Sequence, residues 1–387
     1  MIRYQPLSEF LTEYTLRNDN NQYKPVAVGR YGIRTRDSIY SKELAKDYSK
    51  NKVIYKNTLT VGMGSVQIDI GILTEDIKYS VSPAYHTYEI HDINPVYLRY
   101  CLECRNQDMF TRFVKRGSRQ GKSIDLKRWL TYAIPVFDVQ EQAEIVSVLD
   151  RVSMQISNRH EQLELFEQLV KSRFIELFGD GNDERFPLKT LPQIVAKDRH
   201  ALKRGPFGGA LKKDDFVESG YLVYEQRHAI HNDFEYEKYY ISPKKYQEMS
   251  MFKVSPGDLI ISCSGVTLGR IAEIPVYAKA GIINQALLKV SLDQSIMLNT
   301  FFVHQFRSER IQDILFGFCR GSGIPNFPSM SEVKSVKFIC PPIALQEQFA
   351  AFVEQTDKSK YFACQTLSFL LKLANNLQSW REKQYDY

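Results

Sequence analysis

The most regular hydrophobic pattern of the chain lies between Val139 and Phe178, a stretch without Pro or Gly. Apolar residues recur there at alternating steps of four and three, the heptad spacing of a helix that packs along another helix. Arg159 and Arg173 fall on the same track and interrupt it. The apolar members of the track are Ile145, Leu149, Val152, Ile156, Leu163, Phe166, Val170 and Leu177. The pattern predicts one helix, roughly 60 Å long at about 1.5 Å per residue.

A second long helix is predicted near the C-terminus, over residues 345–383, which also contain no Pro or Gly. Its track is weakened at Thr356 and Lys360. The remaining members of that track are Phe349, Val353, Ala363, Leu367, Leu370, Ala374 and Leu377. Because both tracks are narrow apolar stripes of similar length, we expect the two helices to pack on each other as a coiled coil.

The entry to the two helices is repeated in the sequence. Pro135 precedes Gln140–Gln142, and Pro341 precedes Gln346–Gln348, with the same Gln-Glu-Gln triplet at a shift of 206 residues. A repeat of this length is typical of two copies of a whole unit. We therefore expect each copy to consist of a globular part followed by a long helix.

Two further segments support the repeat. Arg116-Gly117-Ser118 matches Arg320-Gly321-Ser322 at a shift of 204 residues, which predicts an insertion of about two residues in the second copy. Ile54–Leu59 aligns by pattern with Phe252–Leu259, although Asn57-Thr58 stands where the second copy has Gly257-Asp258.

Outside the helices the pattern changes to short β-type runs separated by Gly- and Asn-containing turns. One amphipathic helix is predicted in each copy, over residues 95–113 and 298–316. The fold class is therefore mixed α/β (α+β), with two globular domains and two long helices. We expect globular domains over 1–138 and 181–343, and the long helices within 139–180 and 344–387.

Charge distinguishes the globular parts from the helices. The whole chain carries +6, the first long helix −3 and the second +1, which leaves +8 for the remainder. Positive charge concentrated in the globular parts suits a protein that binds a polyanion. A mildly basic protein without such a partner fits the charge equally well.

Several classes are not favoured by the composition. No run of eighteen apolar residues is present, so we expect no membrane span, and the N-terminus lacks an apolar signal core. Six cysteines in 387 residues suggest a reducing cytoplasm rather than a disulfide scaffold. Cys101 and Cys104 form a single CxxC without the second pair that a zinc site usually has. Neither a metal nor a cofactor is expected.

One motif leaves an alternative open. Gly117-Ser-Arg-Gln-Gly-Lys-Ser123 resembles a phosphate-binding P-loop but has three residues between its glycines instead of four. A nucleotide-dependent enzyme built on this near match is one hypothesis. The other is a DNA-contacting loop, in which Gly lets the backbone approach a phosphate and Lys and Arg supply charge.

Candidate DNA-contacting residues are those whose side chains can bind phosphates or base edges from loops. In the first copy they are Arg30, Arg34, Arg36, Ser65, Gln67, Lys115, Arg116, Arg119 and Lys122. In the second copy they are Arg204, Lys212, Lys213, Arg227, His228, Arg270, Asn284 and Arg320. No catalytic residue is predicted.

Taken together, these motifs resemble the specificity subunit of type I restriction–modification systems (HsdS) over essentially the whole chain. The resemblance is carried by Ile134-Pro135, Gln140–Gln142 into Asp150, Leu169–Asp180, Arg204–Gly208, Tyr221–Arg227, Pro256–Ser262, Pro341-Pro342 and Gln346–Gln348.

The resemblance implies a subunit without catalytic activity and with pseudo-two-fold symmetry. Its two target-recognition domains would each read one half of a bipartite, asymmetric site in double-stranded DNA. The two long helices would pack antiparallel and separate the domains as a spacer. Two methylase subunits (HsdM-like) would bind the helices and carry S-adenosylmethionine, and restriction subunits (HsdR-like) would join through them. A coiled-coil scaffold that does not bind DNA remains the third hypothesis.

Overall fold

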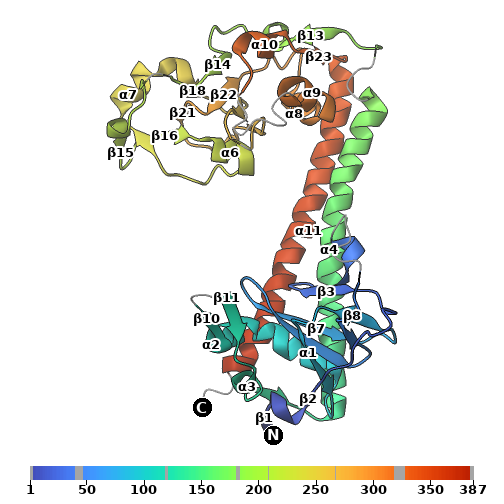
Figure 1. Cartoon of the computed structure of the whole chain (residues 1–387). Helices are drawn as coiled ribbons and strands as arrows, with labels where there is room; N and C mark the ends of the chain where they lie inside the picture. The colour runs from blue at the N-terminus through green and yellow to red at the C-terminus, as the bar shows by residue number, and fades with distance from the viewer. Residues whose placement is uncertain are drawn as a thin grey trace. The chain divides into compact units, whose positions relative to one another are not determined.

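The computed structural model describes residues 3–39, 47–117, 121–179, 184–207, 209–265, 267–317 and 327–383. The chain divides into two compact units (Figure 1). The first comprises Met1–Asn158 and Leu367–Tyr387, and the second Arg159–Thr366. The helices α4 (Val139–Phe178) and α11 (Ile343–Lys383) each contribute residues to both units. The long helix predicted over 139–178 is confirmed, and the second begins two residues earlier than predicted.

The first unit is built around an antiparallel four-stranded sheet of order β2-β9-β6-β7. These strands are Leu11–Tyr14, His86–Ile90, Thr58–Met63 and Ile68–Leu73. Four strand pairs surround it: β1 (Arg3–Pro6) with β12 (Ala133–Val136), β3 (Val26–Gly29) with β4 (Gly32–Thr35), β5 (Lys52–Ile54) with β8 (Tyr79–Val81), and β10 (Val114–Gly117) with β11 (Gly121–Ile124). Its shorter helices are α1 (Pro95–Cys104), α2 (Asn106–Phe113) and α3 (Leu126–Trp129).

The second unit has a four-stranded sheet of order β14-β22-β19-β20, the same plan as the sheet of the first unit. These strands are Leu202–Arg204, Leu287–Val290, Leu259–Ser262 and Ile271–Glu273. A five-stranded sheet joins β15 (Phe216–Val217), β17 (Tyr240–Ile241), β16 (Tyr221–Tyr224), β21 (Gly281–Ile283) and β18 (Lys253–Val254), and β13 (Leu188–Thr190) pairs with β23 (Lys337–Ile339). Its shorter helices are α5 (Leu191–Ile194), α6 (Gln226–His231), α7 (Pro243–Glu248), α8 (Asn299–Arg307), α9 (Glu309–Phe316) and α10 (Met330–Ser335).

Each helix predicted over 95–113 and 298–316 is in fact two helices. The first breaks at Arg105, between α1 and α2. The second breaks at Ser308, whose extended backbone ends α8 and whose hydroxyl accepts the backbone N–H of Ile311 in α9. The hydrophobic pattern continues across both breaks, which is why the sequence predicted single helices.

A buried glutamine joins each long helix to its globular part. The side-chain oxygen of Gln142 accepts the backbone N–H of Asn94 at 2.9 Å, and its amide donates to the carbonyl of Phe137 at 2.8 Å. Gln346 repeats this arrangement with Leu298 and Pro341, at 2.9 and 2.8 Å. Each glutamine thus binds the residue that precedes α1 or α8.

These bonds correct the alignment of the two copies. Gln142 corresponds to Gln346, a shift of 204 residues, and its partners are shifted by 204 residues as well. The triplet alignment at 206 was wrong because it paired Gln142 with Gln348, which is exposed. The shift of 204 already seen at the Arg-Gly-Ser segments therefore continues into the helices, without the predicted insertion.

The turn at Asn57-Thr58 is the structural equivalent of that at Gly257-Asp258. Asn57 and Gly257 both have positive φ, 63° and 85°, the left-handed region that Gly and Asn tolerate best. The Thr58 hydroxyl accepts the N–H of Tyr55, as the Asp258 carboxylate accepts that of Ser255. Different residues thus form the same turn.

The heptad track of α4 faces inward along its whole length. Every member from Ile145 to Leu177, including Arg159 and Arg173, is buried or half-buried. On α11 the same holds from Phe349 to Ala374, while the side chain of Leu377 lies outside the described residues.

Within the second unit the two helices run antiparallel, side by side (Figure 1). Phe349, near the start of α11, packs on Phe174 and Phe178 near the end of α4, with ring centroids 5.4 and 5.6 Å apart. Further along α11, Lys360 lies 4.0 Å from Glu167. Phe301 of α8 joins the same aromatic cluster, 4.7 Å from Phe178. The helix pair and the globular part of this unit therefore share one core.

We expect Gln346→Ala to lower the free energy of unfolding by about 2 kcal/mol, because it leaves buried backbone groups without partners. In a thermal melt this corresponds to a midpoint about 4–8 °C lower. Gln348→Ala is the matched control, since Gln348 is exposed on the same helix. Equal effects of the two variants would contradict the corrected alignment.

The second unit should also lose stability in acid through His304. Burial, with Arg307 and Lys360 nearby, lowers the pKa of His304 to about 4 from its usual 6.5. The folded protein therefore favours neutral His304. The contribution of this preference to the free energy of unfolding is complete above pH 6.5 and is lost as the pH falls toward 4. We expect the stability advantage of the native chain over His304→Gln to shrink by about 2 kcal/mol over that range in chemical denaturation. The exposed His231 provides the control, as His231→Gln should show no such trend.

Candidate nucleic-acid interface

In the first unit, two of the predicted DNA-contacting segments are bonded to each other. Lys122, on β11, donates its ammonium group to the carbonyl of Ser65 in the turn between β6 and β7. The same ammonium group lies 5.4 Å from the ring centroid of Phe110. This hydrogen bond holds strand β11 against the β6–β7 turn.

A third segment lies beside that turn. Gln67, at the end of the turn, lines a cavity of about 930 Å³ together with Arg30 and Tyr31 from the β3–β4 hairpin. Arg99 and Asn106 line it from α1 and α2. The Asn106 side chain accepts the N–H of Ile68 and donates to its carbonyl, so the start of β7 is fixed at this groove. Residues distant in the sequence are therefore assembled on one surface.

The arginines of the β3–β4 hairpin differ in their surroundings. Arg30 and Arg34 are exposed, and their guanidinium groups lie 5.7 and 5.2 Å from the ring centroid of Tyr31. Arg36 is half-buried with its guanidinium 5.5 Å from the centroid of Tyr48. Arg30 and Arg34 are thus the better placed to reach a phosphate or a base edge.

The hairpin β10–β11 presents its charges unequally. Lys115 pairs with Asp125 at 2.7 Å, and this hydrogen bond lowers the pKa of the Asp125 carboxyl. Its charge is therefore partly neutralised. The side chain of Arg116 and the whole of Arg119 lie outside the described residues.

The nucleotide hypothesis for residues 117–123 does not fit this geometry. Gly121–Ile124 is a strand that pairs antiparallel with Val114–Gly117. A P-loop instead leads directly from a strand into the N-terminus of a helix, where backbone N–H groups hold the phosphates. The near match in spacing is therefore part of a β-hairpin.

In the second unit, Arg204 is held at the end of β14. Its guanidinium lies 5.5 and 4.9 Å from the ring centroids of Phe207 and Phe327, and it donates to the carbonyl of Cys263 at 3.5 Å. A Cβ at Gly205 would come within 1.8 Å of the carbonyl oxygen of Asn284, so only glycine fits there. The Arg-Gly segment therefore passes directly beside Asn284.

Asn284 and Arg227 are both partly engaged within the protein. The side-chain oxygen of Asn284 accepts the N–H of Ala286 at 3.0 Å. Arg227 is exposed, lies 4.3 Å from the centroid of the Tyr236 ring and 3.9 Å from the carboxylate of Asp233. Both keep polar groups that a ligand could use.

The assignment of His228 as a DNA-contacting residue is wrong. Only 1% of its surface is exposed. One ring nitrogen accepts the N–H of Glu225 at 3.0 Å, and the other donates to the carbonyl of Tyr236 at 2.9 Å. Both ring nitrogens are thus used to fix the start of α6, and the neighbouring Arg227 alone faces solvent.

The remaining predicted residues of this unit are surface cations. Lys212, Lys213 and Arg270 are exposed. Arg320 lies outside the described residues. Sequence analysis missed two exposed aromatic residues. Tyr31 lies beside Arg30 and Arg34 in the first unit and is 70% exposed, and Phe207 lies beside Arg204 in the second unit and is 66% exposed. The only signal for them was an aromatic residue among arginines in a Gly-containing turn.

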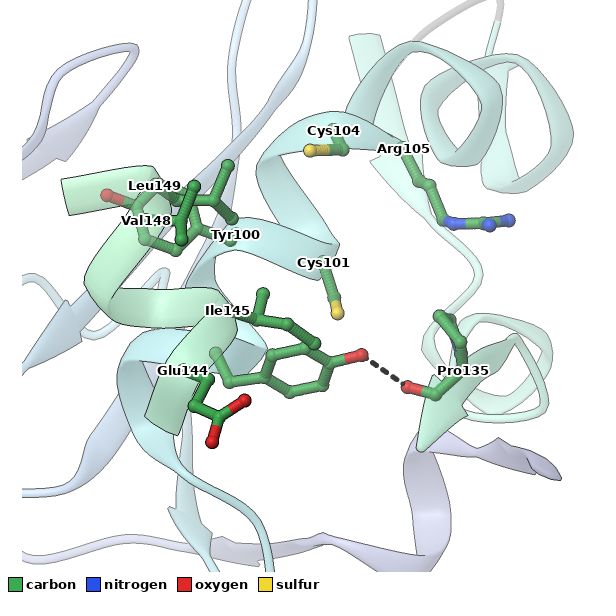
Figure 2. A pocket seen from close by; sticks show the side chains of 10 residues that line it. Tyr100, Cys101, Cys104, Arg105, Pro135, Glu144, Ile145, Val148 and Leu149 are labelled. Atoms are coloured by element: carbon green, nitrogen blue, oxygen red, sulfur yellow. Dashed lines mark hydrogen bonds between the residues drawn. The ribbon is translucent and has the colours of Figure 1, made fainter. Parts of the chain in front are cut away.

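The CxxC pair lies elsewhere, in the apolar pocket shown in Figure 2. Cys101 is buried and Cys104 half-buried on successive turns of α1. The hydroxyl of Tyr97, which also lines this pocket, donates to the carbonyl of Pro135 at 2.8 Å. Among the residues that the structure describes, no cluster of three or more potential metal ligands occurs. The pair packs α1 against the start of α4.

None of the helices in the described part of the chain is long and apolar enough to cross a membrane.

Comparison with known proteins identifies one domain in the chain. Residues 11–167 match the family model for the type I restriction modification DNA specificity domain. This is a class of DNA-recognition domain, and the match covers the first globular part and most of α4. No curated protein matched the sequence.

Solved structures match nearly the whole fold. The crystal structure of the type I restriction–modification system S subunit from M. genitalium has 14% identity and a TM-score of 0.57, covering 98% of this chain and 95% of its own. A structure from work on complex assembly and conformational transition of the type I R-M system has 16% identity and a TM-score of 0.58, covering 98% and 96%.

Residues 11–167 therefore carry a type I restriction–modification DNA specificity domain. The resemblance found in the sequence motifs is confirmed. At these identities the solved structures show the fold, which is that of the S subunit over both units.

We expect Lys122→Ala to weaken DNA binding, because it removes a positive charge and the bond to the β6–β7 turn. Removing one phosphate contact should reduce the slope of log K against log salt concentration by about one. Fluorescence anisotropy with a DNA duplex over a salt series measures this slope. The control is Lys358→Ala, an exposed lysine on α11 that pairs with Glu354. Loss of a nucleotide hydrolysis activity in Lys122→Ala would instead support the enzyme hypothesis.

Proposed function

We propose that this protein is the non-catalytic specificity subunit of a type I restriction–modification complex and reads a bipartite, asymmetric DNA site. The observation that carries the proposal is the repeat itself. Two units have the same sheet order and the same buried glutamine, and each presents cationic side chains on hairpins and turns. Two copies of one recognition unit suit two half-sites.

The DNA-contacting set of the first unit is Arg30, Arg34, Ser65, Gln67 and Lys122, with Lys115 in a weaker role. In the second unit the set is Arg204, Lys212, Lys213, Arg227, Arg270 and Asn284. The exposed arginines can donate two hydrogen bonds to guanine, and Gln67 and Asn284 can pair with adenine. Different side chains at the two sets would give an asymmetric site. The domain limits at 138, 180 and 343 belong to this proposal.

The long helices provide the spacer and the partner surface. Because α4 and α11 each run unbroken between residues of both units, they would fix the unread gap between half-sites. Methylase subunits would dock on their outer faces, with restriction subunits joining through them. Glu161, Glu164 and Glu167 are exposed on α4 and form an acidic face for such a partner. That a structure of similar fold comes from work on complex assembly supports this view.

The decisive experiment expresses the chain with its neighbouring methylase and maps methylated adenines across the host DNA. The expected result is a two-part motif with a constant gap. Exchanging residues 181–343 for those of another family member should change one half of the motif and leave the other half and the gap unchanged. Exchange of 1–138 is the reciprocal control. A single undivided motif would contradict reading by both units, and a chain without salt-dependent DNA affinity would be a scaffold.

A further inference from the structure

The β3–β4 hairpin ends in a two-residue turn whose composition is unusual. Gly29 pairs with Gly32 across the hairpin, which leaves Arg30 and Tyr31 at the tip. Gly32 has a φ of 73°, a left-handed conformation that allows the chain to reverse within two residues. Tyr31 is 70% exposed there. Single exposed aromatic residues are common, so exposure alone assigns no role.

The arginines around the ring separate Tyr31 from other exposed aromatic residues. Arg30 and Arg34 hold their guanidinium groups 5.7 and 5.2 Å from its centroid, within the range of a cation–π interaction. In the described part of the chain, neither arginine forms an ion pair with a carboxylate. Among the described residues, the tip therefore combines an aromatic ring with two guanidinium groups that have no ion-pair partner.

The base of the hairpin is rigid although its tip is exposed. Val28 and Ile33 pack directly over Gly71 in β7, where an added Cβ would come within 2.6 Å of Ile33 and 2.9 Å of Val28. This close approach fixes the hairpin on the central sheet. The tip borders the groove that Gln67 also lines. A ring held in this way loses little conformational freedom on binding.

We propose that Tyr31 enters a groove of the DNA in the half-site read by the first unit. There its ring is inserted at one base-pair step and partly unstacks that step. This inference rests on the proposed function. Arg30 and Arg34 contact the flanking phosphates or base edges, and these contacts position the Tyr31 ring on the duplex. Side chains that enter between base pairs make the site depend on how easily the step deforms, so Tyr31 contributes specificity without hydrogen-bonding a base.

The second unit offers a matched control. Tyr277 is 71% exposed, almost the same as Tyr31, in the segment between β20 and β21. Among the described residues no cation lies over its ring. Tyr277→Ala therefore removes an equally exposed aromatic ring that lacks the flanking arginines.

The test uses the full chain in complex with its methylase and a duplex carrying the mapped motif. We compare Tyr31→Ala, Tyr31→Phe and Tyr277→Ala with the native chain by fluorescence anisotropy. Tyr31→Ala should bind the motif about tenfold more weakly, the size expected for one lost stacking contact. Tyr31→Phe and Tyr277→Ala should bind like the native chain. Tyr31→Ala is made at an exposed tip, so folding should be unaffected.

A second readout locates the inserted ring. 2-Aminopurine, which fluoresces more strongly when unstacked, replaces single bases of the first half-site other than the methylated adenine. The native chain and Tyr31→Phe should raise the signal at one step, and Tyr31→Ala should not.

Three results overturn the inference. If Tyr31→Ala binds DNA as tightly as the native chain, Tyr31 makes no contact with the DNA. If it binds more weakly but the native chain gives no 2-aminopurine signal, Tyr31 contacts the DNA without entering the stack. If it binds DNA normally but binds the methylase poorly, the hairpin tip contacts a protein. A native complex that methylates no defined motif would instead overturn the proposed function, and the inference with it.

Discussion

The rest of the structure depends on how each long helix is fixed to a globular part, and a buried glutamine provides that connection. Gln142 and Gln346 lie near the helix starts, where backbone groups would otherwise lack partners. Each satisfies the N–H ahead of a short helix and the carbonyl of the preceding segment at once. Because an unpaired buried amide is costly, the geometry at this junction has little freedom. The junction therefore sets the direction in which each long helix starts, and the apolar heptad stripes of the two helices can then pack together.

On that frame the residues proposed to contact DNA are held by short contacts. Because Gly71 has no side chain, the β3–β4 hairpin can pack directly on β7. Because Gly205 has none, the Arg204 segment can pass beside Asn284. Lys122 is bonded to the backbone of the β6–β7 turn, and Arg204 lies between two aromatic rings. Side chains prepositioned in this way pay less entropy on binding DNA, which favours discrimination between sequences over general attraction to phosphate. The same logic applies to Tyr31, whose hairpin is fixed at its base and exposed at its tip.

The sequence predicted the elements with strong periodicity and failed where the pattern was local. The heptad fixed the helix at 139–178, since burial on one face leaves a clear period. The β-type runs that the pattern predicts at 25–28, 53–54 and 59–61 overlap strands β3, β5 and β6, and the run at 66–73 begins two residues before β7. Strands as short as Leu11–Tyr14 and Tyr79–Val81 were not foreseen. Pairing with distant partners makes these segments strands, and short runs carry little signal of it. Val114–Gly117 and Gly121–Ile124, which the sequence suggested to be a loop, are paired strands for the same reason.

The amino-acid sequence by itself determined the repeat, the two long helices, the charge of the globular parts and the resemblance to one family, because each depends on spacing or composition over many residues. Only the tertiary structure decided which glutamine of the second Gln-Glu-Gln triplet corresponds to Gln142, because Gln346 is buried and Gln348 is exposed. It also removed His228 from the recognition surface, because both of its ring nitrogens are bonded to backbone groups inside the protein. A side chain's exposure and partners arise from chain segments far apart in sequence, so no local pattern could have settled them.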